Sequence, residues 1–468
     1  MNFKTIFKSL KNKEMRRRVI AVVGILVAYR ILAHVPVPLG DATTFKQAVD
    51  NLINSTDLGG FLNLISGGGL TNFSIILVGL SPYITSSIVM QLLTKAIPRM
   101  EELNNDGETG RRKIAQWTRM LTVPLAIMQS FAYVYILFQE VLASNTATAI
   151  TLTSYDWAIA VTAMTAGSVL LMWLGELITE QGIGNGISTV ILCSIISSLP
   201  TTLAAVGQQL FDTSAGSLSL FGWLNIPVNP TWFLITCGIV LGIIIVLYFI
   251  VKINEAQRII TINYAKRVRG NSAYGGIKSV MPIKLIAAGV IPVIFAVAFL
   301  SLPAFVGQII LRNDPNSSIA QNLVSWFSAP NANNFTELTA ESFIYPVMYF
   351  ILVVVFTYFY TSIIFNAQEI AENLQKQGGF IEGVRPGHET EKYFKRTVNR
   401  LNLFGALALG LIAMLPYIAD YIFIMTLGRP LGLAISGTGL LIIVTVAIEN
   451  LRQINSRALM VTYDDYRE

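Results

Sequence analysis

Long apolar runs recur along this chain of 468 residues, and they constrain its fold more than any other feature. A helix that crosses the hydrocarbon core of a bilayer needs about 20 predominantly apolar residues. With 53% hydrophobic and only 13% charged residues, the composition is typical of an all-α polytopic membrane protein. We predict ten spans, at residues 19–33, 73–93, 117–138, 157–174, 183–199, 232–251, 285–305, 343–365, 401–419 and 431–448.

The basic residues alternate with these runs. They cluster at 4–18, 95–119, 252–284 and 376–400, whereas the five loops on the other predicted side hold only Lys46, Arg312 and Arg429. Because cytoplasmic loops carry an excess of Lys and Arg, both termini and every basic loop are predicted to be cytoplasmic. An even number of spans agrees with this topology.

A division after the fifth span gives two halves of five, which enter the membrane from opposite sides. Inverted repeats of this kind are common in proteins that provide passage, with the path between the halves. The predicted organisation is a cytoplasmic amphipathic segment at 1–18, a first half at 19–208, an external hinge loop at 209–230, a second half at 231–451 and a cytoplasmic tail at 452–468.

One apolar piece is too short to span a bilayer. Residues 61–65 lie between the pair Gly59–Gly60 and the triplet Gly67–Gly69. Glycine-broken backbone is tolerated at membrane depth only where protein buries it or where it lines a cavity. The sequence therefore predicts that this segment fills a path through the protein.

The basic loop at 252–284 carries a strand pattern. Ile260, Ile262 and Tyr264 alternate with polar residues, and a turn sequence follows at 269–272. We expect a β-hairpin that stands out from the membrane. Three basic residues would lie near its tip: Lys266, Arg267 and Arg269.

The basic loop at 366–400 has a helix-like start at 367–376 and a glycine-rich turn that carries Arg385. Projecting basic loops suit an acidic or nucleic-acid partner. We therefore predict that both loops dock a partner.

The sequence offers little support for an enzyme. No phosphate-binding Gly-x-x-x-x-Gly-Lys-Ser/Thr loop is present, and Gly182–Gly186 follows a span instead of a strand, which favours a helix cap or hinge. His34 and His388 fall on opposite predicted sides, and Cys193 and Cys237 lie inside spans. No cofactor and no metal site are predicted.

A small-solute secondary transporter is the alternative. Carriers place ionisable residues near the bilayer midplane, where each is costly and kept for function. Here Arg30, Glu176, Asp420 and Glu449 lie near predicted span ends. This weakens a proton or sodium relay but leaves a carrier of an uncharged solute open.

Six motifs in order along the whole chain resemble the bacterial SecY family, which forms the central subunit of the Sec protein translocase. Any one of them is weak, but the set is specific. The motifs are LSPYITSSI at 80–88, GIGNGIS at 182–188, NYAKR at 263–267, AGVIP at 288–292, GVRPG at 383–387 and GTGLLI at 437–442.

The resemblance implies an hourglass pore between two inverted five-helix halves, closed by a plug at 57–72. It implies a plug that includes Gly60, Phe61, Leu62, Leu64, Ile65, Gly67, Gly68 and Gly69. It implies a ring of apolar side chains at the waist of the pore, namely Ile84, Ile88, Ile187, Ile191, Ile294 and Ile442.

The resemblance also implies a lateral gate between the second and seventh spans, through which signal sequences leave for lipid. The gate residues would be Thr85, Ser87, Gln91, Ile291 and Phe295, with Ser86 as a further small hydroxyl. Many relatives carry serines in the seventh span where this chain has Ala296–Val297–Ala298. We expect an apolar contact to hold this gate closed.

The implied function is passage of unfolded secretory polypeptides across the bacterial plasma membrane, without enzymatic activity in the chain itself. A docked partner, the ATPase SecA or a translating ribosome, would drive the movement through Arg385 and the hairpin. SecE and SecG are the implied small subunits, and no direct DNA binding is expected.

Overall fold

The computed structural model describes residues 12–38, 73–143, 153–211, 218–220, 224–226, 230–264, 267–269, 272–274, 278–314, 316–327, 343–427 and 437–465. The chain divides into two compact units. The first unit comprises residues 1–234, 297–345 and 419–468, and the second comprises 235–296 and 346–418. The plug segment and most of the N-terminal segment lie outside the described residues.

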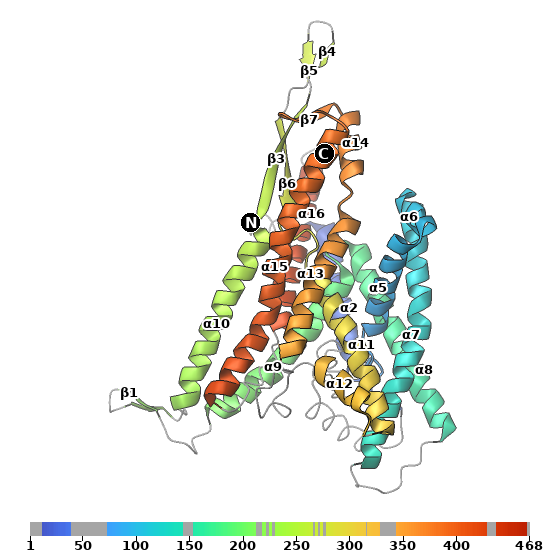
Figure 1. The fold of residues 1–468 in the computed structure, drawn as a ribbon, viewed down its shortest axis with the longest axis vertical. Coiled ribbons are helices and arrows are strands. Elements are labelled where there is room, and N and C mark those ends of the chain that lie inside the picture. Colours follow the sequence, from blue (N-terminus) through green and yellow to red (C-terminus); the bar gives the residue numbers. More distant parts are fainter. Residues whose placement is uncertain are drawn as a thin grey trace. The chain divides into compact units, whose positions relative to one another are not determined.

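Helices dominate both units (Figure 1). Those of the first unit are α2 (Lys13–Leu32), α5 (Ser81–Ala96), α6 (Pro98–Asn105), α7 (Gly107–Ala143), α8 (Ser154–Gln181), α9 (Gly186–Leu210), α12 (Ser318–Phe327) and α16 (Gly437–Asp465), with the short strands β1 (Leu218–Leu220) and β2 (Leu224–Ile226). Those mainly of the second unit are α10 (Pro230–Glu255), α13 (Ile344–Ile364), α14 (Ala367–Lys376) and α15 (His388–Leu427). Helix α11 (Ile291–Asn313) runs from the second unit into the first.

Six helical segments in the described part of the chain are long and apolar enough to cross a membrane. They are Gly107–Phe138, Ser154–Gln181, Trp232–Glu255, Ile291–Leu311, Ile344–Lys376 and His388–Ala419. These match the third, fourth, sixth, seventh, eighth and ninth predicted spans. The other four predicted runs overlap helices α2, α5, α9 and α16, and the arrangement of ten spans in two halves stays a prediction.

The second predicted span is wrong at its start. The apolar run begins at residue 73, but α5 begins only at Ser81, with Pro82 in its first turn. Turns occupy residues 73–80, where Phe73 has φ 45° and Gly79 has φ 64°. These left-handed conformations cannot continue a right-handed helix, so composition alone overestimated the helix.

The predicted hairpin at 252–284 is confirmed. Strand β3 (Gln257–Tyr264) pairs antiparallel with β6 (Lys278–Lys284), and β4 (Arg267–Arg269) pairs with β5 (Ser272–Tyr274) at the far end (Figure 1).

The second basic loop joins the same sheet. Strand β7 (Gly379–Ile381) pairs with β3 in the order β6-β3-β7, with Ile262 opposite Ile381. A buried cluster holds α14 and the start of α15 against this sheet. It consists of Ile260, Ile262, Ile283, Leu374, Ile381, Phe394 and Val398. The two loops that the sequence presented as separate elements therefore form one packed body.

Candidate functional site

The two flanks of the predicted plug are joined. An isolated antiparallel bridge pairs Pro36 with Ser74. The Val37 amide donates to the Phe73 carbonyl at 2.9 Å, and the Ile75 amide donates to the Val35 carbonyl at 3.0 Å. Residues 35–37 and 73–75, on either side of the predicted plug, are thus bonded to each other.

The segment 73–80 is fixed on its other side by α8. The Ser168 hydroxyl donates to the Gly79 carbonyl at 2.7 Å. A Cβ at Gly167 would lie 2.1 Å from the Ile75 carbonyl oxygen, so only glycine permits this approach. Residues 73–80 are therefore held by residues 35–37 on one side and by α8 on the other.

An apolar cluster lies where the sequence predicts the lateral gate. Leu77 and Val78, immediately before α5, belong to the same buried cluster as Ala304 of α11. The rings of Tyr133 in α7 and Phe305 in α11 lie 5.3 Å apart. Within the first unit, this contact is apolar, and its role as a lateral gate stays a prediction.

The predicted polar gate residues of α5 bond within their own helix. The Thr85 hydroxyl donates to the Ser81 carbonyl at 3.0 Å, and the Gln91 Nε2 donates to the Ser87 hydroxyl at 3.0 Å. Ser86 is buried and donates to the Thr118 carbonyl of α7 at 2.6 Å. Ser86 therefore packs against α7, which does not agree with its expected place at the gate.

The predicted gate residues of α11 lie in the second unit. Phe295 is buried, and its ring meets those of Phe356 and Tyr360 of α13 edge-on, at 6.1 and 6.0 Å between centroids. Ile291 is half-buried at the start of α11. The aromatic contact with α13 could not be predicted from the sequence, because it depends on tertiary packing.

The six isoleucines of the predicted ring lie on four helices. Ile84 and Ile88 are buried on α5, which packs against α7. Ile191 is buried and Ile187 half-buried on α9, which packs against α16, the helix of the half-buried Ile442. Ile294 is buried on α11 in the second unit. Closure of a ring by these side chains stays a prediction.

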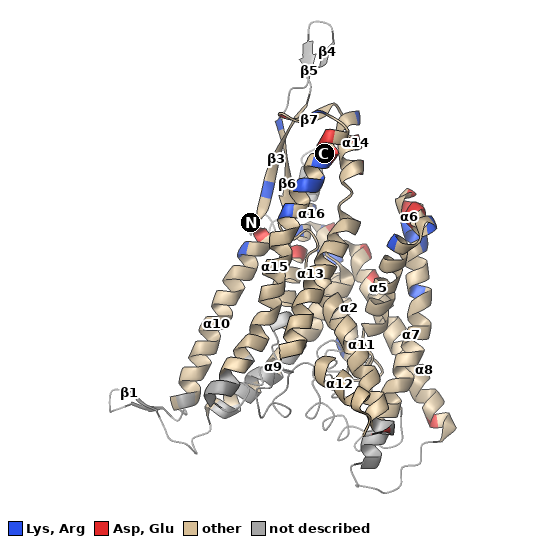
Figure 2. Ribbon diagram, in the orientation of Figure 1, with Lys and Arg blue, Asp and Glu red and all other residues tan. Residues whose placement is uncertain are grey.

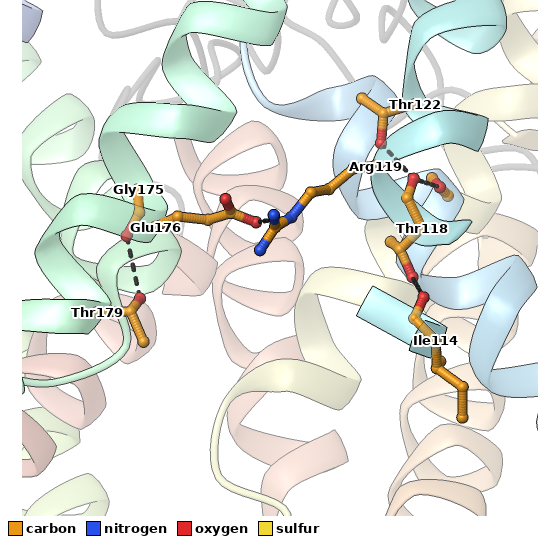
Figure 3. Close-up of polar contacts among 8 residues, drawn as sticks. Ile114, Thr118, Arg119, Thr122, Gly175, Glu176 and Thr179 are labelled. Atoms are coloured by element: carbon orange, nitrogen blue, oxygen red, sulfur yellow. Dashed lines mark hydrogen bonds and ion pairs between the residues drawn. The ribbon is translucent and has the colours of Figure 1, made fainter. Parts of the chain in front are cut away.

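An ion pair that the sequence did not predict connects α7 and α8. The Arg119 Nε lies 2.6 Å from a carboxylate oxygen of Glu176, as Figure 3 shows. Thr179 donates to the Gly175 carbonyl one turn further along α8. Because Arg119 is 48% exposed, solvent screens the pair, and we expect it to contribute at most about 1 kcal/mol. Glu176 is therefore paired instead of serving as an isolated relay group.

The glycine-rich segment at 182–186 caps two helices, which confirms the predicted helix cap. Gly182 ends α8 in the left-handed conformation with φ 70°, and Asn185 caps α9 by accepting from the Ile187 and Ser188 amides. Side chains of α16 hold it. The Gly184 amide donates to Gln453 Oε1 at 2.8 Å.

Arg385 lies on an ordered turn. The Thr390 hydroxyl donates to the Arg385 carbonyl at 2.8 Å, and Gly383 and Gly387 on either side have φ of 80° and 97°. The Arg385 side chain is exposed, and it forms no ion pair with the described residues. The predicted basic residue fixed at a turn is confirmed.

The hairpin residues are described only in part. Lys266 lies outside the described residues, and Arg267 and Arg269 lie in β4, in the outermost strand pair. Among the described residues, no group of three or more His, Cys, Asp or Glu side chains could hold a metal ion.

The sequence that forms these elements matches a known family. The SecY family model matches residues 74–451. The chain belongs to the SecY family. It is 36% identical to the "Protein translocase subunit SecY" of Streptomyces scabiei over 464 residues, which covers 98% of both chains. It is also 36% identical to the SecY of Corynebacterium glutamicum over 468 residues, with 98% of both chains covered.

Solved structures share the fold of this SecY-family chain. One is described as "The structure of a protein conducting channel", with a TM-score of 0.56, 20% identity and coverage of 93% of this chain and 90% of the other. A second, with a TM-score of 0.57, 20% identity and the same coverage, concerns a SecY plug domain that stabilises the closed state of the channel. At this identity the likeness shows the fold alone.

Proposed function

We propose that this SecY-family protein is a channel that conducts unfolded polypeptides across the bacterial plasma membrane. The observation that carries the proposal is the 36% identity, over 98% of the chain, to relatives named protein translocase subunits. A SecY structure whose description assigns a plug domain to the closed channel supports the proposed plug at 57–72.

The physical problem that such a channel solves is the cost of charge in hydrocarbon. A charged side chain at the bilayer centre costs at least ~2.5 to 3.5 kcal/mol, so a hydrophilic polypeptide needs a wet path. A constriction of branched apolar side chains excludes water and ions when it is closed and presents no charge that traps the passing chain. We assign this role to the ring of isoleucines that includes Ile191 and Ile442.

A signal sequence has the opposite preference. Each of its CH₂ groups gains ~0.8 kcal/mol on leaving water, so it partitions into lipid once the wall of the channel opens. The apolar contact between residues 77–78 and Ala304 supports the proposed gate. Opening this gate breaks apolar packing.

Energy for movement comes from a partner, since the sequence holds no phosphate-binding loop. We propose that SecA or a translating ribosome docks on the body formed by the two basic loops, with Arg385 as a contact, and that SecE and SecG complete the complex. A structure of Sec61 in a canine ribosome-channel complex, with a TM-score of 0.52 and 18% identity, supports a ribosome as one partner. The chain itself is not an enzyme in this proposal.

Reconstitution into vesicles tests the function. The full chain is incorporated with SecE and SecG, and SecA, ATP and an unfolded precursor are added outside. We expect ATP-dependent protection of the precursor from protease. Uptake of small solutes without any partner, together with no protected precursor, would instead identify a carrier.

A further inference from the structure

One exposed face of α15 changes character along its length. Its first part carries Lys392, Lys395, Arg396 and Arg400, all exposed at helical spacing. From residue 403 the same face is apolar and exposed, with side chains from Leu403, Phe404, Leu407, Leu411 and Leu415. Figure 2 shows basic residues in the part of α15 near the β-strands, and the following stretch of the helix, residues 401–419, carries no charged side chain.

A shallow cavity of 420 Å³ lies at this change, between α15 and α13. Its lining includes the four basic side chains and Leu403 of α15, and the half-buried Tyr358 of α13. None of the four basic residues is in an ion pair with the described part of the chain. The cavity therefore offers positive charge that no ion pair among the described residues neutralises.

The facing side of α13 is also apolar where lipid would lie against it. Val347, Ile351 and Val355 are exposed at successive turns before Tyr358. Tyrosine is enriched where membrane proteins meet the headgroup region, because its ring is apolar and its hydroxyl is polar. The exposed side chains of both helices thus change from apolar to polar at the same cavity.

We propose that this α13–α15 cavity binds the headgroup of an anionic phospholipid, with its acyl chains along the apolar face that continues from Leu403. Basic pockets between transmembrane helices suit phospholipid phosphates. A soluble acidic protein or an RNA would use the basic part alone, whereas the uninterrupted passage from basic to apolar on one helix face matches a molecule that is anionic at one end and apolar at the other. The proposal does not depend on the channel function.

The test measures binding of phosphatidylglycerol and of zwitterionic phosphatidylcholine to the purified full-length complex by native mass spectrometry. The variant K395Q/R396Q/R400Q removes three charges from the cavity. The charge-matched control R99Q/R111Q/K113Q removes three exposed charges from α6 and α7. We expect phosphatidylglycerol affinity to fall about tenfold or more in the cavity variant and less than about twofold in the control, since each basic residue near the headgroups strengthens binding.

The swap K395R/R396K/R400K should keep the affinity, because it keeps the charge. Equal losses in the cavity variant and the control would overturn the proposal in favour of general surface charge. Displacement of the lipid by millimolar inorganic phosphate would show a free-phosphate site instead. Unchanged lipid binding with lost binding of an acidic partner protein would assign the face to docking and also overturn the proposal.

Discussion

Replacing Thr390 by valine tests whether the geometry of the Arg385 turn matters for docking. Thr390 is 3% exposed, and its hydroxyl is the donor to the Arg385 carbonyl. Valine keeps the shape but removes the hydrogen bond, which contributes about 1 kcal/mol net. A change of this size alters the ratio of ordered to disordered turn about fivefold.

A partner that binds only the ordered turn then binds in proportion to its population. We therefore expect the dissociation constant for SecA on the reconstituted complex to rise by up to about fivefold in Thr390→Val. Thr390→Ser retains the hydroxyl and should match the parent. Arg385→Glu, which reverses the charge, should impair ATP-driven translocation much further while leaving the protein inserted.

The readout is SecA affinity by fluorescence titration, alongside protease protection of a precursor. If Thr390→Val and Thr390→Ser both bind like the parent while Arg385→Glu does not, the charge matters and the fixed turn does not. If Arg385→Glu also translocates normally, the docking role of this turn is wrong.

Two further predictions concern the first unit. Ile191→Asn places an amide at a side chain that is 2% exposed, and it should raise the ion conductance of the closed channel in planar bilayers, because water then enters the apolar ring. The control Ile191→Leu should seal like the parent. A conductance equal to the parent's in the asparagine variant contradicts the ring. Gly186→Ala should lower the melting temperature by several degrees, because its Cβ would lie 1.7 Å from the Gly175 carbonyl oxygen. The control Gly207→Ala in the same helix meets nothing within 4 Å and should be neutral or slightly stabilising. Equal melting temperatures for the two variants would show that the contact between Gly186 and Gly175 adjusts at little cost.

Local patterns predicted the features that local physics determines. The alternation at Ile260 and Ile262 gave the hairpin, because the period of two is a property of a strand with one buried face. The glycines at 182–186 gave the cap, since a left-handed residue is needed to end α8. Arg385 at a turn followed from glycine and proline in the same way.

Features that depend on distant partners were not predictable. The pairing of β7 with β3 places Ile381 opposite Ile262, and nothing in either loop alone indicates it. The ion pair between Arg119 and Glu176 likewise depends on how α7 and α8 pack. The start of α5 was misjudged because its preceding residues are apolar enough for a helix, yet the bridge to Pro36 holds them in turns.

That bridge lets the segment proposed as the plug be exchanged as a unit. Because the Val37 and Phe73 backbones are already joined, the intervening chain starts and finishes at one anchored point whatever its sequence. Lengthening a closed loop is inexpensive, at only about 0.6 kcal/mol for each doubling. If the proposed function holds, plugs of different length and composition can therefore evolve between residues 37 and 73, or be grafted there, without changes to the helices of the first unit.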